Sequence, residues 1–431
     1  MKKGYPEYKD TKFEWLGAIP SHWGVAKIGV LFDQRNEKVS DTDFPALSVT
    51  KNGIVPQLEN AAKTDAGDNR MLVRKGDFVI NSRSDRKGSS GVSSLDGSVS
   101  LISIVLRPLE HNHRYIHHLF RSYNFQEEFY RNGKGIVADL WSTRYSEMKN
   151  IYIPVIPMDE QNSIADYLDK ETSRIDGLIS EKQNFINLLK EKRQALISHV
   201  VTKGLNPNVE MKDSGVEWIG EIPRHWDAKR IKHVAKVNPS TNRPEILPDE
   251  SIGFVPMTNV NEKIGVIRKV DVRKYSEVSS GYTLFQNGDV IFAKITPCME
   301  NGNCAMIADM NYGIGFGSTE FIVFRPGKLI MQEYLHMVLR NNELRKICKR
   351  FMSGTAGQQR IATPFLENFP LALPPIEEQK AIVKEVGKKV KRLESLEDEV
   401  RKSIELLKEH RTALISAAVT GKIDLRNKEV A

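Results

Sequence analysis

The sequence is poor in cysteine and has no long apolar run. Its three cysteines are Cys298, Cys304 and Cys348. An odd number without framework spacing does not fit a set of disulfides, and without a second cysteine pair it does not fit a zinc site. This pattern favours a reducing, cytoplasmic compartment. No segment approaches about 18 uncharged apolar residues, and the first residues lack the apolar stretch of a signal peptide, so we expect no membrane contact.

Familiar catalytic and cofactor motifs are also missing. The sequence has no GxxxxGK[ST] loop, no HExxH run and no Asn/Asp-Pro-Pro-aromatic run of an amino-methyltransferase. The glycines of 313–317 precede a strand-like run rather than a helix, which argues against a cofactor loop. His113 and His117 have the spacing of metal ligands, but of the nearby histidines only His117 has a counterpart in the repeat described below, at His336. A shared helix position therefore explains them better, and we expect no catalysis, cofactor or metal in this chain.

The overall composition is that of a soluble globular protein with a basic surface. Apolar residues make up 40% and charged residues 27% of the chain, and 431 residues leave room for two to four domains. The formal net charge is +8. A basic surface attracts nucleic acid because binding releases counterions, although many basic proteins bind none.

The most informative feature is that the chain repeats itself at long range. EWLGAIPSHW at 14–23 returns as EWIGEIPRHW at 217–226, and RQALISHVVTKG at 193–204 returns as RTALISAAVTGK at 411–422. A shorter echo joins PMDEQ at 157–161 to PIEEQ at 375–379. A unit of about 210 residues is too long for a solenoid repeat, so we expect two similar modules in tandem with pseudo-twofold symmetry.

Between these repeated segments lie two bodies that share a skeleton but little sequence. Gly76–Ile80 matches Gly288–Phe292 as a turn followed by a buried strand. Tyr115-Ile116-His117 matches Tyr334-Leu335-His336 in a predicted amphipathic helix, and the match ends at Arg121 in the first body and at Arg340 in the second. Loops absorb the differences in length and often carry function, so the two bodies suggest one task performed on two different targets.

A long helix is predicted to close each repeat, starting near Asp159 and near Glu377. Each would run for about 40 residues, or about 60 Å. The second has apolar residues at 3–4 spacing, interrupted by Glu397 and Arg411, and the first has a broader apolar face. The apolar positions are Val386, Val390, Leu393, Val400, Ile404, Leu407 and Leu414 in the second helix, and Leu168, Ile175, Leu178, Ile179, Phe185, Ile186, Leu189, Leu196 and Val200 in the first.

These stripes favour antiparallel pairing of the two helices over packing of each on its own domain. Thr202-Lys203-Gly204 is a glycine stop signal. The second helix ends at Thr420-Gly421-Lys422, and we expect the chain beyond it to return beside the N-terminus. The fold class predicted is α+β, with two bodies of mixed sheet and helix separated by an antiparallel coiled coil. The expected segments are 1–23, 24–150 (first body), 151–204 (first helix), 205–226, 227–368 (second body) and 369–431 (second helix and tail).

This organisation resembles the specificity subunit of a Type I restriction-modification system, over essentially the whole chain. The resemblance rests on the tryptophan segment before each body, the run from Ile153 to Gln161 with its counterpart from Leu373 to Gln379, and the two helix endings. The run SGTAGQQRI at 353–361 is also typical of the family. Its equivalent in the first body, 132–144, departs from that pattern, so a role for the glycine-glutamine-arginine run does not carry over to that body.

The resemblance implies two target recognition domains, each reading half of a split and asymmetric sequence in double-stranded DNA. The helices would hold the domains apart and dock two methyltransferase subunits, and restriction subunits would join through the complex. S-adenosylmethionine and ATP with Mg²⁺ would be bound by those partners, so this chain would be non-catalytic. A helix pair is a suitable ruler, because half-sites on one face of DNA lie about 34 Å apart or a little more.

Three loops and the end of the 132–144 run carry the candidate DNA contacts. Arginine reads guanine, glutamine reads adenine, and lysine suits phosphates, but the alternative for each loop is a solvated or structural turn. The candidates in the first body are Arg83, Arg86, Lys87 and Arg144, and those in the second are Lys294, Asn301, Gln358, Gln359 and Arg360.

The repeated tryptophans allow two interpretations. Trp15, Trp23, Trp218 and Trp226 either dock the methyltransferase or pin each body against a helix base, and both roles are compatible. For the whole chain, the alternatives to a DNA specificity subunit are a coiled-coil scaffold that binds proteins and a free-standing nuclease or methyltransferase. The second would need acidic metal ligands or a cofactor loop, which the sequence lacks.

Overall fold

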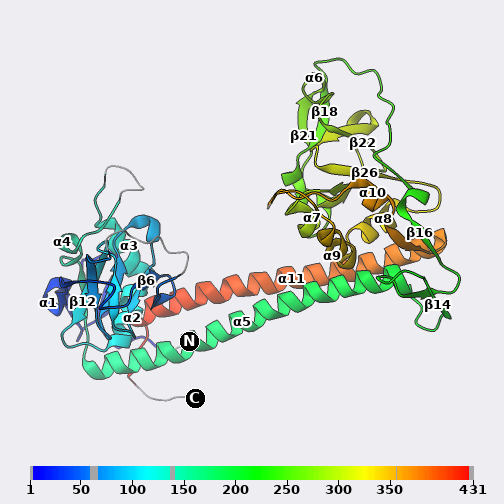
Figure 1. Cartoon of the computed structure of the whole chain (residues 1–431). Helices are drawn as coiled ribbons and strands as arrows, with labels where there is room; N and C mark the ends of the chain where they lie inside the picture. The colour runs from blue at the N-terminus through cyan, green and yellow to red at the C-terminus, as the bar shows by residue number, and fades with distance from the viewer. Residues whose placement is uncertain (1–2, 59–66, 136–140, 356, 427–431) are drawn as a thin grey trace. The chain divides into compact units, whose positions relative to one another are not determined.

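The chain forms two compact units. The computed structural model describes residues 3–58, 67–135, 141–355 and 357–426. One unit consists of residues 1–183 and 401–431, and the other of residues 184–400. Each unit contains one tryptophan segment, one body, the start of one long helix and the end of the other (Figure 1).

The first unit has the following elements. Its strands are β1 (Tyr8–Asp10), β2 (Ala18–Pro20), β3 (Gly24–Lys27), β4 (Phe32–Gln34), β5 (Lys38–Val39), β6 (Leu47–Thr50), β7 (Gly53–Pro56), β8 (Arg70–Val73), β9 (Phe78–Asn81), β10 (Ser90–Val92), β11 (Gly97–Val99), β12 (Ser103–Pro108) and β13 (Tyr152–Val155). Its helices are α1 (Ile28–Leu31), η1 (Ser84–Arg86), α2 (His113–Arg121), α3 (Tyr123–Arg131), α4 (Tyr145–Met148) and the first part of α5 (Met158–Lys203).

The second unit repeats most of these elements. Its strands are β14 (Met211–Asp213), β15 (Glu221–Pro223), β16 (Asp227–Arg230), β17 (Ala235–Val237), β18 (Ser251–Val255), β19 (Val260–Asn261), β20 (Val266–Ile267), β21 (Asp271–Lys274), β22 (Thr283–Gln286), β23 (Val290–Ala293), β24 (Cys304–Met306), β25 (Ile314–Gly317), β26 (Phe321–Pro326) and β27 (Pro370–Leu373). Its helices are η3 (Ile231–His233), η4 (Met257–Asn259), α6 (Tyr275–Val278), α7 (Cys298–Asn301), η5 (Asn311–Gly313), α8 (Gln332–Leu339), α9 (Asn342–Arg350), α10 (Thr363–Glu367) and the first part of α11 (Ile376–Val419).

The two bodies are built on the same antiparallel sheet. Its strand order is β10-β9-β12-β4 in the first body and β24-β23-β26-β17 in the second. Helix α2 or α8 packs on this sheet, and its apolar face joins the core of its unit. A second sheet differs: it is β11-β8-β5 in the first body and β21-β18-β25-β22 in the second, where β18 and β25 are parallel. The α+β fold and the shared skeleton are thus confirmed.

The predicted glycine-aspartate turns are confirmed, and the aspartates have a structural role. Gly76 and Gly288 have φ of 95° and 91°, and the strands that follow are buried throughout. The Asp77 carboxylate accepts hydrogen bonds from Arg35 Nε at 2.7 Å and Nη2 at 3.1 Å. The Asp289 carboxylate accepts two matching bonds, at 2.7 and 2.9 Å, from Arg325. The turn aspartate is shared, but its arginine directly follows β4 in the first body and lies in β26 in the second.

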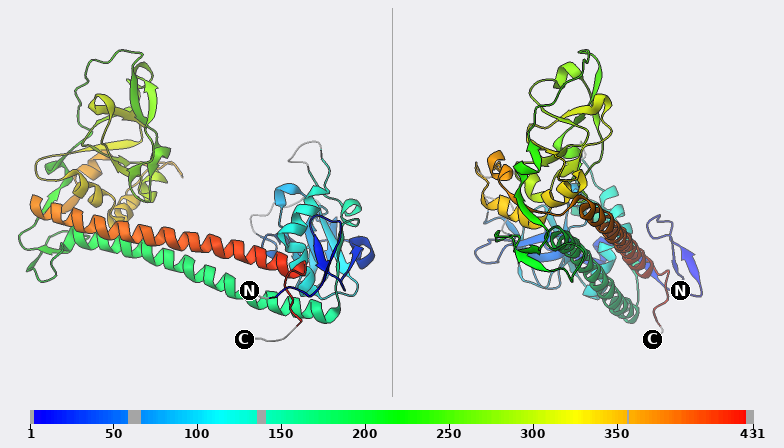
Figure 2. Two further views of the ribbon diagram at one scale, coloured as in Figure 1. Left: turned by 180° about the vertical axis from the view of Figure 1, so that it is seen from behind. Right: turned by 90° about the vertical axis from the view of Figure 1, so that its right-hand side faces the viewer.

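Both long helices are confirmed, at 46 residues for α5 and 44 for α11. Within each unit the two helices run antiparallel and side by side (Figure 2). In the first unit Arg411, one of the two predicted interruptions, donates to the Asp176 carboxylate at 2.9 and 3.1 Å. In the second, Arg193 donates to Glu394 at 3.3 Å. Placing Phe185 on the apolar face was wrong: it is 42% exposed, because its neighbour Ile186 takes the buried position.

The helix ends follow the sequence signals. Gly204, directly after α5, has φ of 75°, and its N–H donates to Val200 O. After α11 the N–H of Lys422 donates to Ala417 O at 2.7 Å, which satisfies a carbonyl of the last turn. The chain then returns beside the N-terminal segment as predicted, since Asp424 N donates to Lys3 O at 3.0 Å. Among the described residues, no helix is long and apolar enough to cross a membrane.

Helices α2 and α8 each carry a histidine at the matched position, half-buried at His117 and buried at His336. His117 Nδ1 accepts from Val92 N of β10 at 3.3 Å, and His336 Nε2 lies 3.3 Å from Cys304 O of β24. These are the matched edge strands of the two sheets, as the shared helix position predicts. Burial lowers the pKa of His117 to about 3, and burial with the charge of Arg340 lowers the pKa of His336 to about 4.

These histidines predict acid sensitivity. The unfolded chain binds a proton near pH 6.5 and the folded one only near pH 4, so the contribution of His336 is intact above pH 6.5 and falls as pH drops. Chemical unfolding should show that wild type loses about 2–3 kcal/mol more than His336→Gln between pH 7 and pH 4.5. Equal losses in the two proteins would mean that His336 does not titrate on unfolding.

Candidate nucleic-acid interface

Three loops of the second body meet in one surface, which we call the loop platform: residues 294–297, 318–320 and 353–361. Lys294 N donates to Glu320 O at 2.9 Å, and Lys294 O accepts from Ile361 N at 2.9 Å. Thr296 N donates to Gln359 O at 2.9 Å. The structure thus brings Lys294 and the glutamine-arginine run together, although they are 64 residues apart or more. Ala356 lies outside the described residues.

The first body builds an equivalent platform from residues 82–87, 101–102, 134–135 and 141–144. Ser82 N donates to Ile102 O, and Thr143 N donates to Ser82 O. Two isolated bridges, Arg83 with Ser142 and Lys134 with Ser142, repeat Ile295 with Arg360 and Ser353 with Arg360 in the second body. The bonds therefore match Ser142 to Arg360, a correspondence that sequence comparison did not give. Residues 136–140 of the predicted loop lie outside the described residues.

The predicted cations of the first body lie on or next to its platform. Arg83 and Arg144 are exposed, and Arg144 directly precedes α4. Arg86 is 3.5 Å from Asp85, and Lys87 forms an ion pair with Glu127. Surface pairs of this kind contribute little stability, so phosphates can compete for these cations.

In the second body the candidates differ in how they are held. Asn301 is exposed at the end of α7, and Gln358 is exposed in its loop. Arg360 is clamped by Glu320, whose oxygens lie 2.8–3.2 Å from its nitrogens. Hydrogen bonding raises the pKa of Arg360 and lowers that of Glu320. Glu320 was missed from the sequence, because no local pattern links it to a residue 40 positions away.

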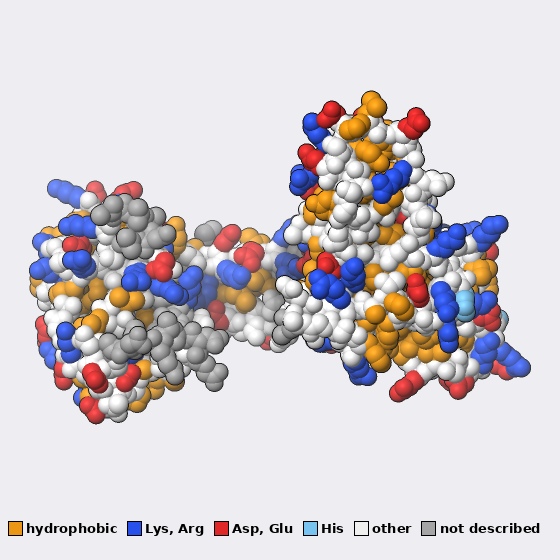
Figure 3. Space-filling model, turned by 45° about the horizontal axis from the view of Figure 1, so that its top comes forward, with side chains coloured by type: hydrophobic (Ala, Val, Ile, Leu, Met, Phe, Trp, Pro, Cys, Tyr) orange, Lys and Arg blue, Asp and Glu red, His pale blue; other side chains and the backbone are white. Residues whose placement is uncertain are grey.

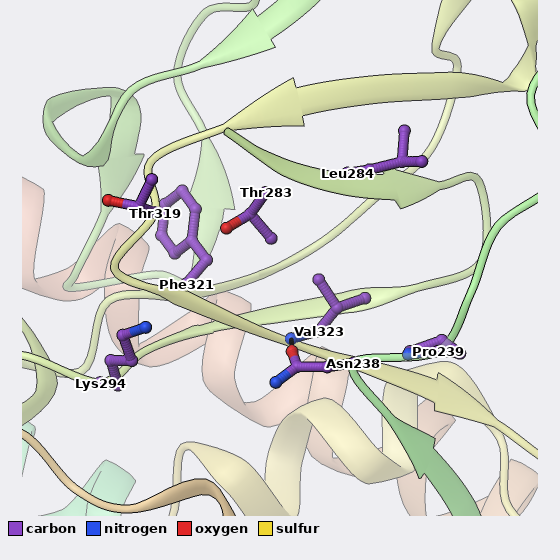
Figure 4. Close-up of a pocket in the computed structure, with 8 residues that line it drawn as sticks. All are labelled: Asn238, Pro239, Thr283, Leu284, Lys294, Thr319, Phe321 and Val323. Carbon is purple, nitrogen blue, oxygen red and sulfur yellow. Dashed lines mark hydrogen bonds between the residues drawn. The ribbon is translucent and has the colours of Figure 1, made fainter. Parts of the chain in front are cut away.

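A hollow of about 300 Å³ adjoins the second platform (Figure 4). Lys294 and Thr319 lie at one end of it and Leu284 and Pro239 at the other. Its wall is mixed, with an amide, hydroxyls and an amine beside apolar side chains. Such a surface suits base edges, which offer both hydrogen-bonding groups and the thymine methyl.

Figure 3 shows Lys and Arg side chains gathered in patches on both bodies, with acidic side chains between them.

The tryptophan segments form structural clamps. Trp23 and Trp226 have no exposed surface, and their Nε1 atoms donate to Glu160 Oε2 and Glu378 Oε2, each at 2.9 Å. Trp15 is also buried, and only Trp218 is partly exposed. Pinning of each body to a helix start is therefore observed, and docking of a methyltransferase by these four residues stays a prediction.

The glutamines that follow Glu160 and Glu378 add further contacts to each tryptophan clamp. Gln161 Oε1 accepts from Asn112 N at 2.9 Å, and Gln379 Oε1 accepts from Met331 N at 2.8 Å. Both glutamines therefore tie the long helix to the entry of α2 or α8. His22 and His225 lie 2.6 and 2.8 Å from the same two glutamates. The repeated His-Trp and Glu-Gln pairs thus form the same set of contacts in both units. In the sequence alone they are visible only as repeated motifs.

Other motifs have structural explanations. Gly313–Gly317 covers β25, where a Cβ on Gly315 would lie 2.7 Å from the Phe285 ring, so the glycine allows close packing of a strand. In the part of the chain that the structure describes, no cluster of His, Cys, Asp and Glu could hold a metal ion. Cys304 and Cys348 are buried, and burial raises the pKa of each thiol to about 12.

Comparisons with known proteins agree on one family. Residues 223–406 match the model of the Type I restriction modification DNA specificity domain. The Type I restriction enzyme EcoAI specificity subunit of Escherichia coli is 35% identical over 38% of this chain and 28% of its own length, and the EcoEI subunit is 34% identical over 38% and 27%. The chain therefore aligns with less than a third of these two relatives. The MjaVIII specificity subunit of Methanocaldococcus jannaschii is 24% identical over 97% of this chain and 98% of its own.

Solved structures share the fold. A chain from a structure of type I R-M complex assembly has a TM-score of 0.68 at 16% identity, covering 94% of this chain and 99% of its own. The crystal structure of the HsdS subunit from Thermoanaerobacter tengcongensis has a TM-score of 0.53 at 16% identity, covering 96% and 100%. At this identity the likeness concerns the fold alone.

Proposed function

We propose that the chain is a member of the Type I restriction-modification DNA specificity family and that it gives such a complex its DNA sequence specificity. Each body reads one half of a split DNA site, and the paired helices α5 and α11 set the distance between the halves. The chain is a non-catalytic subunit. Methyl transfer, with S-adenosylmethionine, and cleavage, with ATP and Mg²⁺, belong to partner subunits.

The observation that carries this proposal is the matched pair of loop platforms. Two hydrogen bonds between the loops and two bridges recur in both bodies, whereas the side chains differ, as at Ser142 and Arg360. A constant frame with variable side chains suits two readers of different sequences. The net charge of +8 supports contact with phosphates.

The partner proposal rests on the helices. A continuous helix of 46 residues is about 70 Å long, which is sufficient to space two half-sites. We propose that two methyltransferase subunits dock beside the helices and tryptophan segments, and that restriction subunits join through them. Mapping of methylated adenines in cells with and without this chain tests the function: a split, asymmetric motif should depend on it. A scaffold protein would leave methylation unchanged.

A further inference from the structure

The ion pair on the second platform holds the Arg360 guanidinium from one side. Arg360 Nε lies 3.0 and 3.2 Å from the two Glu320 oxygens, and Nη2 lies 2.8 Å from Oε1. Nη1 donates to Gln358 O at 3.3 Å. The Arg360 side chain is still 46% exposed, against 23% for Glu320. The carboxylate therefore covers the Nε–Nη2 edge of an arginine that remains open to solvent.

Counting donors shows what this clamp leaves available. A guanidinium has five N–H groups, one on Nε and two on each terminal nitrogen. The contacts with Glu320 and Gln358 use one on each nitrogen. One N–H therefore remains on Nη1 and one on Nη2. An arginine can contact N7 and O6 of guanine end-on through its two terminal nitrogens, as one of its bidentate geometries.

We infer that Arg360, oriented by Glu320, reads a guanine in the major groove of the half-site bound by the second body. This inference rests on the proposed function and adds a base and a residue to it. Glu320 is a positioning residue: it holds the guanidinium plane before DNA arrives, so less side-chain entropy is lost on binding. It also makes the arginine a poorer partner for phosphates, because its charge is already compensated.

At the matched positions, which lie among the described residues, the first body has no such ion pair. The bonds that build the platforms match Ser142 to Arg360 and Ile102 to Glu320. A serine beside an isoleucine has neither the fork of donors nor the carboxylate that orients it. The guanine contact is therefore specific to the second half-site, and each half-site should respond to different substitutions.

The test uses the full chain assembled with its methyltransferase, on duplexes that carry the mapped target. 7-Deazaguanine, which lacks the N7 acceptor, replaces guanine at one position at a time. For the wild-type complex, 7-deazaguanine at one position of the second half-site should lower the affinity for the duplex about tenfold to a hundredfold. Arg360→Ala should lose a similar amount on the natural target and be insensitive to the same substitution. Glu320→Gln should lose part of the sensitivity while keeping the salt dependence of nonspecific binding.

A matched control is Arg268→Ala. Arg268 lies in the same unit, is 52% exposed and pairs with Glu262 at 3.2 Å. Its replacement by alanine therefore removes a similarly paired charge at a residue outside the platform. It should keep the sensitivity of wild type. The inference is overturned if the Arg360→Ala complex still loses affinity on 7-deazaguanine substitution. It is also overturned if 7-deazaguanine lowers the wild-type affinity at no position of the second half-site. A Glu320→Gln variant identical to wild type would remove the positioning role. Absence of any specific target for wild type would instead overturn the proposed function, and the inference with it.

Discussion

Replacing Trp226 by alanine should lower the free energy of unfolding by about 3–5 kcal/mol. The side chain has no exposed surface and packs in the core of the second unit with the end of α5 and the start of α11. Its removal opens a cavity there and also takes away the donor that lies 2.9 Å from Glu378 Oε2. Chemical unfolding of the isolated chain measures the loss.

Two variants separate the causes of that loss. Trp226→Phe keeps most of the volume and removes the hydrogen bond, and should cost about 1–3 kcal/mol. Trp218→Ala removes a tryptophan from the same segment that is only partly buried and whose Nε1 has no partner among the described residues, and should cost less than Trp226→Ala. If Trp226→Ala kept the stability of wild type and only weakened assembly with a methyltransferase, the residue would be a docking contact and not a clamp.

Replacing Asp289 by alanine should cost about 3–5 kcal/mol, because it breaks a buried ion pair from one side. The Asp289 side chain is fully buried and accepts bonds from Arg325 and from Gln286 N, the latter at 2.8 Å. Without it the guanidinium, which is 21% exposed, keeps its bonds to Thr241 Oγ1 and Ser240 O but loses its counter-charge, and the Gln286 N–H loses its acceptor. Urea unfolding of wild type and variant at neutral pH measures the difference.

The control for Asp289 is an exposed aspartate in the same unit. Asp249 pairs with Lys274 at 2.9 Å, but the two side chains are 86% and 58% exposed, so Asp249→Ala should cost under about 1 kcal/mol. Adding Arg325→Leu to Asp289→Ala should recover part of the loss, since an unpaired buried charge costs more than an apolar pair. Equal losses at Asp289 and Asp249 would contradict the assigned burial.

Much of the frame could be predicted from local sequence. The turns at Gly76 and Gly288 and the glycine after α5 require backbone conformations that few other residues adopt, so single positions identified them. The long helices followed from a regular apolar spacing. The exposed Phe185 shows the limit of that signal, because spacing alone does not decide which of the adjacent residues Phe185 and Ile186 takes the buried position.

The site was harder to predict because its contacts join distant segments. Pairing of Glu320 with Arg360 depends on how two loops meet, and nothing near either residue indicates it. The parallel pair of β18 with β25 is similar, since a buried strand pattern does not specify its neighbour. The motifs at 157–161 and 375–379 were visible, but the contacts of Glu160 with Trp23 and of Glu378 with Trp226 were not.

The most direct test of the account is a methylation map with exchanged bodies. Cells would carry the methyltransferase with this chain, without it, or with residues 24–150 replaced by the corresponding body of another member of the family. The account predicts a split motif that is absent without the chain, and a change in one half alone when the body is exchanged. A methylation pattern that is the same in all three strains would contradict it.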